Sequence, residues 1–288
     1  MKRLALASMA LGAAFAAWTM VGTAEAADPM CEPDKVAEKY PGIAGKTIKI
    51  GADPQTPPYV FRDPDNFDNV IGYDADLSRA VFACAGVDVE FELGGWSGLL
   101  PALVAGQIDV MWDTLYYTAE RAEQVDYIIY MQAGTGGMTQ KGNPKGIGGL
   151  DDACGNVFSV GLGTVEEAAM RSKSQECEDA GMEGVEIMTY PDVAAGFRQV
   201  ENQRADIMLS DLSLLTKYTL DNADTTEMAF KILTGFKIGV AVVNDADDLL
   251  RAIEDGLRVM EANGTKHDTF VKYQMDPDLA LPTEVLRD

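Results

Sequence analysis

Apolar positions in the first half of the chain follow two alternating periods. Between residues 46 and 112, short runs with strand periodicity flank segments in which apolar residues recur at helical spacing, as at Leu77, Val81 and Cys84. The expected strands are 46–53, 87–93 and 108–112, and the expected helices are 72–86 and 96–107, each closed by a glycine. This order of elements predicts an α/β sheet with right-handed crossovers.

The same pattern starts again in the second half. Strands are expected within 149–164 and over 185–190, 205–211 and 237–243, and helices over 165–181, 191–203 (with Pro191 at its start) and 213–222, with two amphipathic helices in 246–274. We therefore expect two α/β lobes, lobe 1 from 27–138 and 238–288 and lobe 2 from 139–237. Ligands of open α/β sheets bind beyond the carboxyl ends of the strands, so two facing lobes predict a cleft that closes by a hinge motion.

The segment 54–69 interrupts this pattern. Pro57 and Pro58 lie within it, and we expect a loop without regular structure there.

The N-terminus has the features of an export signal. Lys2 and Arg3 precede an uncharged run over 4–21, and an Ala-Glu-Ala signal ends at Ala26, so we expect cleavage after Ala26 and a periplasmic protein. A membrane anchor is the alternative. Cys31 follows Asp-Pro-Met rather than an apolar triplet, which argues against a lipid anchor, and no second apolar run is long enough to span a bilayer.

The net charge limits the classes of partner that we expect, and the cysteine content predicts disulfides. The net charge of −23 argues against nucleic acid or an anionic membrane surface as a partner. An even number of cysteines in an exported chain favours disulfides over metal ligation. Cys154 and Cys177 bracket one strand-helix unit, so we pair them and pair Cys31 with Cys84.

Several classes of enzyme are disfavoured by what the sequence lacks. His267 is the only histidine and lies in a polar C-terminal turn, where we expect it to be exposed. A Ser-His-Asp triad or a histidine-rich metal site is difficult to build around it. No nucleophile-elbow, P-loop or dinucleotide motif is present. We therefore expect neither a histidine-based catalytic triad nor a metal or cofactor.

Five segments, in order, resemble one known family: IGYDADLSRAVFACAG, WSGLLPALVAGQIDVMWDTLYYTAER, VGLGTVEEA, ADIMLSD and RVMEANGTKHDTFVKY. They look like the family 3 extracellular solute-binding proteins, and the resemblance covers roughly 46–275. It implies the two-lobed periplasmic-binding-protein fold of type II and no catalysis. It also implies a monomeric receptor that delivers an amino acid, or a related small zwitterion, to the membrane permease of an ABC importer.

The resemblance also implies how the zwitterion is held. Both of its charges need partners when the cleft closes, because an unpaired buried charge costs several kcal/mol. Arg121, in the Thr118–Arg121 segment, matches the family arginine that binds the carboxylate. Asp211 matches the second-lobe acid that meets the ammonium. A surface arginine and a plain helix cap are the respective alternatives.

Two further positions match the family site. Thr164 follows Gly163 in a turn where a hydroxyl and helix N-terminal N–H groups meet the carboxylate, and an ordinary N-cap is the alternative. Trp96 corresponds to an aromatic residue that packs on the ligand, with a cation–π contact if the ligand is cationic. A core tryptophan is the alternative.

Other positions depart from the family pattern. Tyr116 replaces a serine or threonine, Asp113 replaces a small residue, and Thr56 takes the place of an early aromatic. Asp113, with Asp53 at the cleft edge, would suit a second cationic or donor group, as in a basic amino acid or an ectoine-like osmolyte. Hydrogen bonds from backbone N–H groups to Asp113, and a loop cap at Asp53, are the alternatives.

Two other functions use the same fold. Cyclohexadienyl dehydratases resemble this family and need a general acid in the cleft, for which Glu166 and Glu167 are the second-lobe candidates besides Asp211. As first-turn residues, both glutamates are also favoured by the helix dipole alone. A partner that presents the ligand to a sensor is the third possibility.

Overall fold

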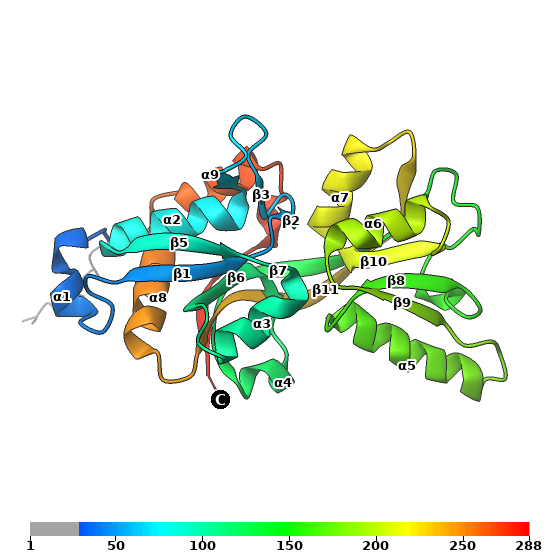
Figure 1. The fold of residues 1–288 in the computed structure, drawn as a ribbon, viewed down its shortest axis with the longest axis horizontal. Helices are drawn as coiled ribbons and strands as arrows, with labels where there is room; N and C mark the ends of the chain where they lie inside the picture. Colours follow the sequence, from blue (N-terminus) through cyan, green and yellow to red (C-terminus); the bar gives the residue numbers. More distant parts are fainter. Residues whose placement is uncertain (1–28, 288) are drawn as a thin grey trace, which may run out of the picture.

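The computed structural model describes residues 29–287, and the predicted signal segment 1–26 lies outside them. The described chain folds as two α/β lobes joined through long central strands (Figure 1). Among residues 29–287, no helix combines the length and the apolar character that crossing a bilayer requires.

Lobe 1 is built on a parallel three-strand unit in which β1 lies between β5 and β6. Its main elements are β1 (Thr47–Ala52), α2 (Tyr73–Ala85), β5 (Asp88–Leu93), α3 (Trp96–Val104), β6 (Val110–Tyr116), α4 (Ala119–Ala122), α8 (Asp247–Ala262), α9 (Thr265–Lys272) and β12 (Ala280–Leu286), with η1 (Pro33–Lys35), α1 (Val36–Lys39) and η3 (Pro277–Leu279) at the edges. The strands and helices predicted for this half are confirmed. His267 is exposed on α9, as expected.

Lobe 2 repeats the scheme, with β8 between β10 and β9 and parallel to both. Its elements are η2 (Leu150–Asp152), β8 (Val157–Gly161), α5 (Val165–Asp179), β9 (Glu186–Tyr190), α6 (Val193–Glu201), β10 (Ile207–Asp211) and α7 (Leu212–Asp221). One detail of the prediction is wrong: α6 does not begin at Pro191. Asp192 caps it by accepting a hydrogen bond from the Ala195 N–H, so Pro191 precedes the cap.

Two long antiparallel strands run through both lobes, β7 (Val125–Gln140) and β11 (Thr226–Val243). Within lobe 1, β11 pairs β6 and β12 pairs β7, whereas in lobe 2 β10 pairs β7. The register between β7 and β11 shifts between Leu233 and Lys237, next to the predicted end of lobe 2 at residue 237. Figure 1 shows both strands crossing between the lobes. The residue limits assigned to the lobes stay predictions.

The segment 54–69 is more regular than the sequence predicts. It contains β2 (Gln55–Thr56) and β3 (Val60–Arg62), which with β4 (Val70–Ile71) form a small antiparallel sheet. Thr56 pairs Val60 across a tight turn that holds both prolines, so the turn ends the ladder without disrupting it. Tyr59, in the same turn, is only 1% exposed.

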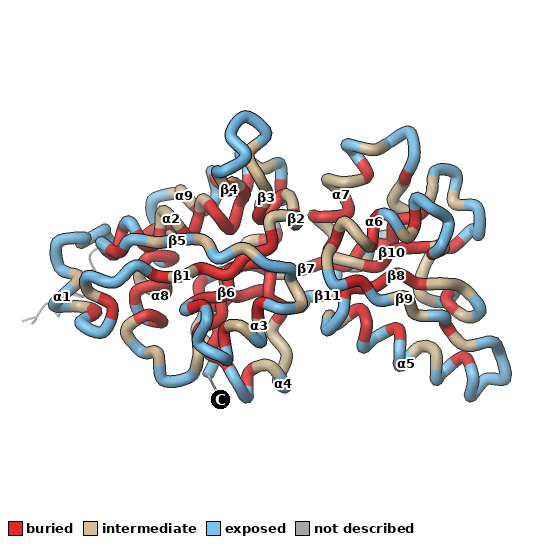
Figure 2. Tube along the Cα trace, in the orientation of Figure 1, coloured by how far each residue is buried: buried red, intermediate tan, exposed pale blue. Residues whose placement is uncertain are grey.

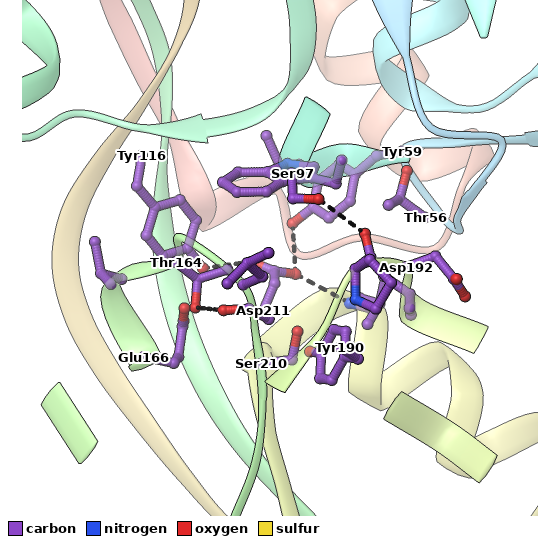
Figure 3. A pocket seen from close by; sticks show the side chains of 18 of the residues that line it. Thr56, Tyr59, Ser97, Tyr116, Thr164, Glu166, Tyr190, Asp192, Ser210 and Asp211 are labelled. Atoms are coloured by element: carbon purple, nitrogen blue, oxygen red, sulfur yellow. Dashed lines mark hydrogen bonds between the residues drawn. The ribbon is translucent and has the colours of Figure 1, made fainter. Parts of the chain in front are cut away.

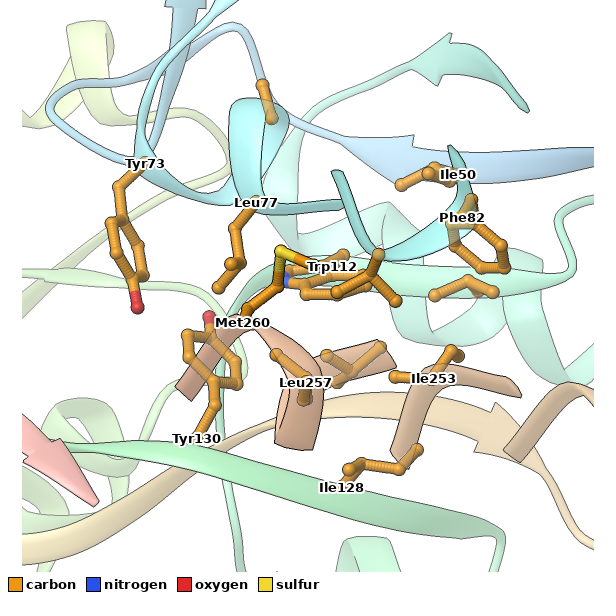
Figure 4. Close-up of a cluster of buried hydrophobic side chains, with 14 of the residues drawn as sticks. Ile50, Tyr73, Leu77, Phe82, Trp112, Ile128, Tyr130, Ile253, Leu257 and Met260 are labelled. Atoms are coloured by element: carbon orange, nitrogen blue, oxygen red, sulfur yellow. The ribbon is translucent and has the colours of Figure 1, made fainter. Parts of the chain in front are cut away.

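The larger hydrophobic core of lobe 1 lies between its sheet and helices α2 and α8, and a smaller one includes residues of α3. Trp112 of β6 packs with Phe82 of α2 and with Ile253 and Leu257 of α8 (Figure 4). Figure 2 shows buried segments along the central strands and exposed ones at the loops and outer helix faces. This packing fixes the strand ends from which the cleft is built.

Both predicted disulfides are confirmed. Cys31–Cys84 ties the N-terminal segment to α2, and Cys154–Cys177 ties the start of lobe 2 to α5.

Candidate ligand-binding cleft

A pocket opens between the lobes at the carboxyl ends of β6 and β10 and the N-termini of α3 and α5 (Figure 3). Lobe 1 lines it with Thr56, Tyr59, Trp96, Ser97, Thr114, Tyr116 and Arg121, and lobe 2 with Gly161, Leu162, Thr164, Val165, Glu166, Tyr190, Pro191, Asp192, Val193, Ser210, Asp211 and Leu214. Five of the seven predicted ligand residues line this pocket: Arg121, Asp211, Trp96, Thr164 and Tyr116.

Arg121 projects into the pocket from the short helix α4. The Thr118 hydroxyl caps this helix by accepting from the Arg121 N–H. The guanidinium donates from Nη1 to the Tyr116 carbonyl at 2.8 Å and from Nη2 to the Gly163 carbonyl of lobe 2 at 2.7 Å. It also lies 5.5 Å from the centre of the Trp96 ring. Hydrogen bonds within residues 29–287 thus engage two of the five guanidinium N–H groups and hold the plane of the group beside the pocket.

Asp211 lies opposite, at the junction of β10 and α7. Its Oδ1 accepts from the backbone N–H groups of Ser213 and Leu214, so it is the N-cap of α7. Its carboxylate also accepts from two hydroxyls of lobe 1: Tyr59 at 3.0 Å to Oδ1, and Tyr116 at 2.9 Å to Oδ2. Figure 3 shows both tyrosines directed toward Asp211. Burial raises the pKa of Asp211, and the four hydrogen bonds oppose that rise.

Thr164 and Trp96 also combine structural contacts with a place on the wall. The Thr164 hydroxyl accepts from the Glu167 N–H and donates to the Gly161 carbonyl, so the N-cap of α5 is confirmed. Trp96 begins α3, and its indole N–H donates to the Asp113 carbonyl at 3.0 Å. One edge of the indole is therefore fixed while the residue lines the pocket.

Asp113 and Asp53 lie behind the wall, which corrects the expectation that they face a ligand. Asp113 is 0% exposed and accepts from the Asp53 N–H at 2.7 Å and from the Thr56 hydroxyl at 2.8 Å. Asp53 accepts from the backbone N–H of Trp96. Strand side chains alternate between faces, so placing Thr114 and Tyr116 on the wall turns Asp113 inward. These contacts agree with the alternatives: Asp113 accepts from a backbone N–H group, and Asp53 caps its loop by accepting from the Gln55 N–H.

Thr114 has an unusual conformation at this wall. Its φ of 49° lies in the left-handed region, which is rare for a β-branched residue. The buried Asp74 carboxylate accepts from the Thr114 N–H at 3.1 Å and from the Tyr130 hydroxyl at 2.7 Å. Asp74 thus holds this part of the wall in place.

Two residues of the pocket, Tyr59 and Glu166, differ from what the sequence predicts. Tyr59, which the sequence did not single out, places an aromatic ring on the wall three positions after Thr56, because the β2–β3 turn carries it there. Glu166, interpreted as a first-turn helix residue, is only 6% exposed and lines the pocket. Its Oε1 accepts from the Thr135 hydroxyl of β7 at 3.1 Å. Glu167 instead pairs with Arg171 at 2.6 Å and does not line the pocket.

The pocket wall carries more acidic than basic side chains. Among the lining residues that the structure describes, Arg121 is the one cation, and Glu166, Asp192 and Asp211 are carboxylates. Between residues 29 and 287, no three His, Cys, Asp or Glu side chains lie in an arrangement that could hold a metal ion. The arrangement can hold a small molecule with separate anionic and cationic groups.

Comparison with known proteins agrees with this geometry. The family model of bacterial extracellular solute-binding proteins, family 3, matches residues 48–276. The chain belongs to this family. A curated relative, the L-cystine-binding protein TcyJ of Escherichia coli strain K12, is 26% identical over 220 residues, which are 76% of this chain and 79% of the relative.

Solved structures of similar proteins share the fold. An ancestral arginine-binding protein bound to arginine superposes with a TM-score of 0.72 at 28% identity, covering 79% of this chain and 97% of that one. The ancestral amino acid-binding protein AncCDT-1, a precursor of cyclohexadienyl dehydratase, gives a TM-score of 0.69 at 27% identity, covering 84% of this chain and 98% of that one. The two-lobed fold of type II expected for the chain is therefore confirmed.

Proposed function

We propose that this solute-binding protein holds an α-amino acid between its lobes and delivers it to the membrane permease of an ABC importer. One observation carries the proposal: Arg121 of lobe 1 and Asp211 of lobe 2 line the same pocket from opposite walls. A bound α-amino acid has an anion and a cation a few ångströms apart, so one molecule can meet both side chains.

The carboxylate would bind Arg121. The planar guanidinium suits two parallel hydrogen bonds to a carboxylate, and its present contacts to two carbonyls fix its orientation. Thr164, at the N-terminus of α5 in lobe 2, adds the positive end of a helix dipole to the same pocket.

The ammonium would bind Asp211. The helix-cap bonds occupy Oδ1, whereas Oδ2 accepts from the Tyr116 hydroxyl among the described residues and has further lone-pair capacity. A ligand held by both charges would bridge the lobes. Because it can contact both lobes only when the cleft is closed, its binding would favour closure. Export to the periplasm, a monomeric state and docking on a permease remain parts of the proposal.

A thermal-shift screen of the twenty amino acids tests the proposal, because a ligand that binds only the folded protein raises its melting temperature. Arg121→Lys and Asp211→Asn should each remove the shift that the best ligand gives. Arg258→Lys, whose parent residue pairs with Glu254 on α8, should keep it. If no amino acid produces a shift in the wild-type protein, the proposal is wrong.

A dehydratase is the second candidate, because Glu166 is a buried carboxylic acid on the pocket wall. Burial raises the pKa of Glu166, which favours the protonated form that a general acid needs. The similarity to AncCDT-1 supports testing this activity. Turnover of prephenate or arogenate by the purified protein, lost in Glu166→Gln, would establish the enzyme.

A further inference from the structure

We propose that Glu166 determines the specificity of the pocket and selects an amino acid that carries a second cationic nitrogen. This inference rests on the proposed function and deepens it. In the view of Figure 3, Glu166 and Tyr116 lie on one side of Asp211, and Asp192 lies on the other.

Glu166 is a buried carboxyl group that forms no salt bridge with a described residue. It is 6% exposed, and its Oε1 accepts from the neutral Thr135 hydroxyl at 3.1 Å. Within the described part of the chain it forms no ion pair, and Arg121, the cation on the lobe 1 wall, donates to two backbone carbonyls and acts on Glu166 through its charge alone. Glu167, one residue later, has its charge matched by Arg171.

The charges of a simple amino acid leave Glu166 unmatched. Its carboxylate would pair with Arg121 and its ammonium with Asp211. Asp192, the third carboxylate, accepts from the Ala195 N–H at the start of α6, so the helix N-terminus already stabilises its charge. Glu166 then remains as a buried carboxylate facing the ligand, and such a group costs several kcal/mol when unpaired.

A second cationic nitrogen on the ligand would remove that cost. A site with a buried polar group discriminates strongly against an analogue that leaves the group unpaired. The nitrogen can belong to a basic side chain, or to the second ammonium of a double zwitterion. In both cases the same interaction with Glu166 provides the selectivity.

Protonation of Glu166 should report the same contact. Burial raises its pKa, and the nearby Asp211 raises it further. A cationic ligand favours the ionised carboxylate, so its binding should release protons. A neutral amino acid gives the Glu166 carboxylate no counter-charge, so its binding should release fewer protons.

Calorimetric titration with matched ligands tests the proposal. L-Arginine and the neutral L-citrulline are nearly isosteric, as are L-lysine and L-2-aminoheptanoic acid, in which a methyl group replaces the ε-ammonium. The wild-type protein should bind the cationic member of a pair roughly 10- to 100-fold more tightly, the ratio expected for a hydrogen bond to a charged group. In Glu166→Gln the ratio should fall to about threefold or less. Glu167→Gln should keep the wild-type ratio.

Two additions sharpen the result. L-Cystine bound tightly and with the same dependence on Glu166 would identify the second ammonium of a double zwitterion as the group recognised. For the cationic ligand, the observed binding enthalpy should change with the ionisation enthalpy of the buffer in the wild-type protein, and Glu166→Gln should lose that dependence. Circular dichroism and the melting temperature verify that each variant is folded.

The outcomes separate this inference from the proposed function. Equal affinity of the wild-type protein for both members of each pair, or an unchanged ratio in Glu166→Gln, would overturn the role of Glu166. If the bound neutral amino acid still requires Arg121, the proposed function survives that result. If no amino acid binds at all, both proposals are wrong.

Discussion

The Tyr116 hydroxyl lies 2.9 Å from Oδ2 of Asp211, so the end of β6 in lobe 1 donates a hydrogen bond to the end of β10 in lobe 2. Tyr59 makes a second cross-lobe bond to the same carboxylate. The Arg121 guanidinium and the Ser97 hydroxyl add bonds to the lobe 2 carbonyls of Gly163 and Pro191. Side chains of the protein itself therefore contribute to lobe closure.

Removing the Tyr116 hydroxyl should weaken ligand binding. The bond to Asp211 forms only when the lobes meet, so Tyr116→Phe shifts the equilibrium toward the open arrangement and lowers the apparent affinity. A net loss of about 1 kcal/mol corresponds to roughly a fivefold weaker affinity, measured by calorimetric titration. Tyr273→Phe removes a hydroxyl that contacts Asp76, which does not line the pocket, and should leave the affinity unchanged. Equal affinities for wild type and Tyr116→Phe would contradict the role assigned to the hydroxyl.

The free energy of unfolding should fall as pH rises from about 4 to 7. Burial raises the pKa of Asp74 to about 7, whereas an aspartate in an unfolded chain titrates near 4. In that window the folded state binds more protons than the unfolded state, so this group destabilises by up to about 1.4 kcal/mol per pH unit. Burial raises the pKa of Asp113 in the same direction.

Urea unfolding at pH 5 and pH 8 measures this dependence. Asp74→Asn mimics the protonated acid, since its amide can accept from the Thr114 N–H and donate to the Tyr130 hydroxyl. The variant should show a smaller loss of stability between the two pH values than the wild-type protein. An identical loss in both proteins would exclude Asp74 as a source of the pH dependence.

The sequence predicts much of the cleft because its motifs lie at strand and helix ends. Arg121 and Asp211 are far apart in the chain, yet Arg121 follows β6 and Asp211 ends β10, and the carboxyl ends of both strands reach the cleft. Their nearness follows from the topology of the two α/β units. The predicted disulfides also agree with the structure, because one pair brackets a single strand-helix unit.

Features that the sequence does not predict depend on tertiary packing, which the periodicity of apolar residues does not report. The full length of β7 is one of them, because the strand contains Gly134, Gly136 and Gly137, and glycine is uncommon within strands. At Gly137 an added Cβ would lie 2.5 Å from the Phe230 ring, so close packing between β7 and β11 requires glycine there. The sequence could not separate a cleft position of Glu166 from a solvent-exposed one, because a first-turn glutamate is compatible with both.

Loss of either disulfide should destabilise the protein without abolishing ligand binding. The chain-entropy relation gives about 3 kcal/mol for Cys154–Cys177, with a sequence separation of 23, and about 4 kcal/mol for Cys31–Cys84, with a separation of 53. Paired substitution by alanine and guanidinium unfolding would measure both losses. A loss near zero for both pairs would show that the bridges do not restrict the unfolded chain.

Replacing Thr164 by alanine should lower both stability and affinity. The variant loses the N-cap of α5, which costs about 1 kcal/mol of stability, and it alters the helix N-terminus at the pocket. Asp192→Ala removes a comparable N-cap from α6. It therefore serves as a reference for the loss of stability that a missing cap causes at another helix of the cleft. A Thr164→Ala protein that loses stability but keeps full affinity would limit Thr164 to a structural role.

The central claim is that Arg121 and Asp211 hold one amino acid between the lobes. Titration of the wild-type protein and Arg121→Ala with the best ligand of the thermal-shift screen tests it most directly. We predict a dissociation constant of about micromolar for the wild-type protein, equivalent to roughly −8 kcal/mol, and no measurable binding by a folded Arg121→Ala. Equal affinities in the two proteins would contradict the claim.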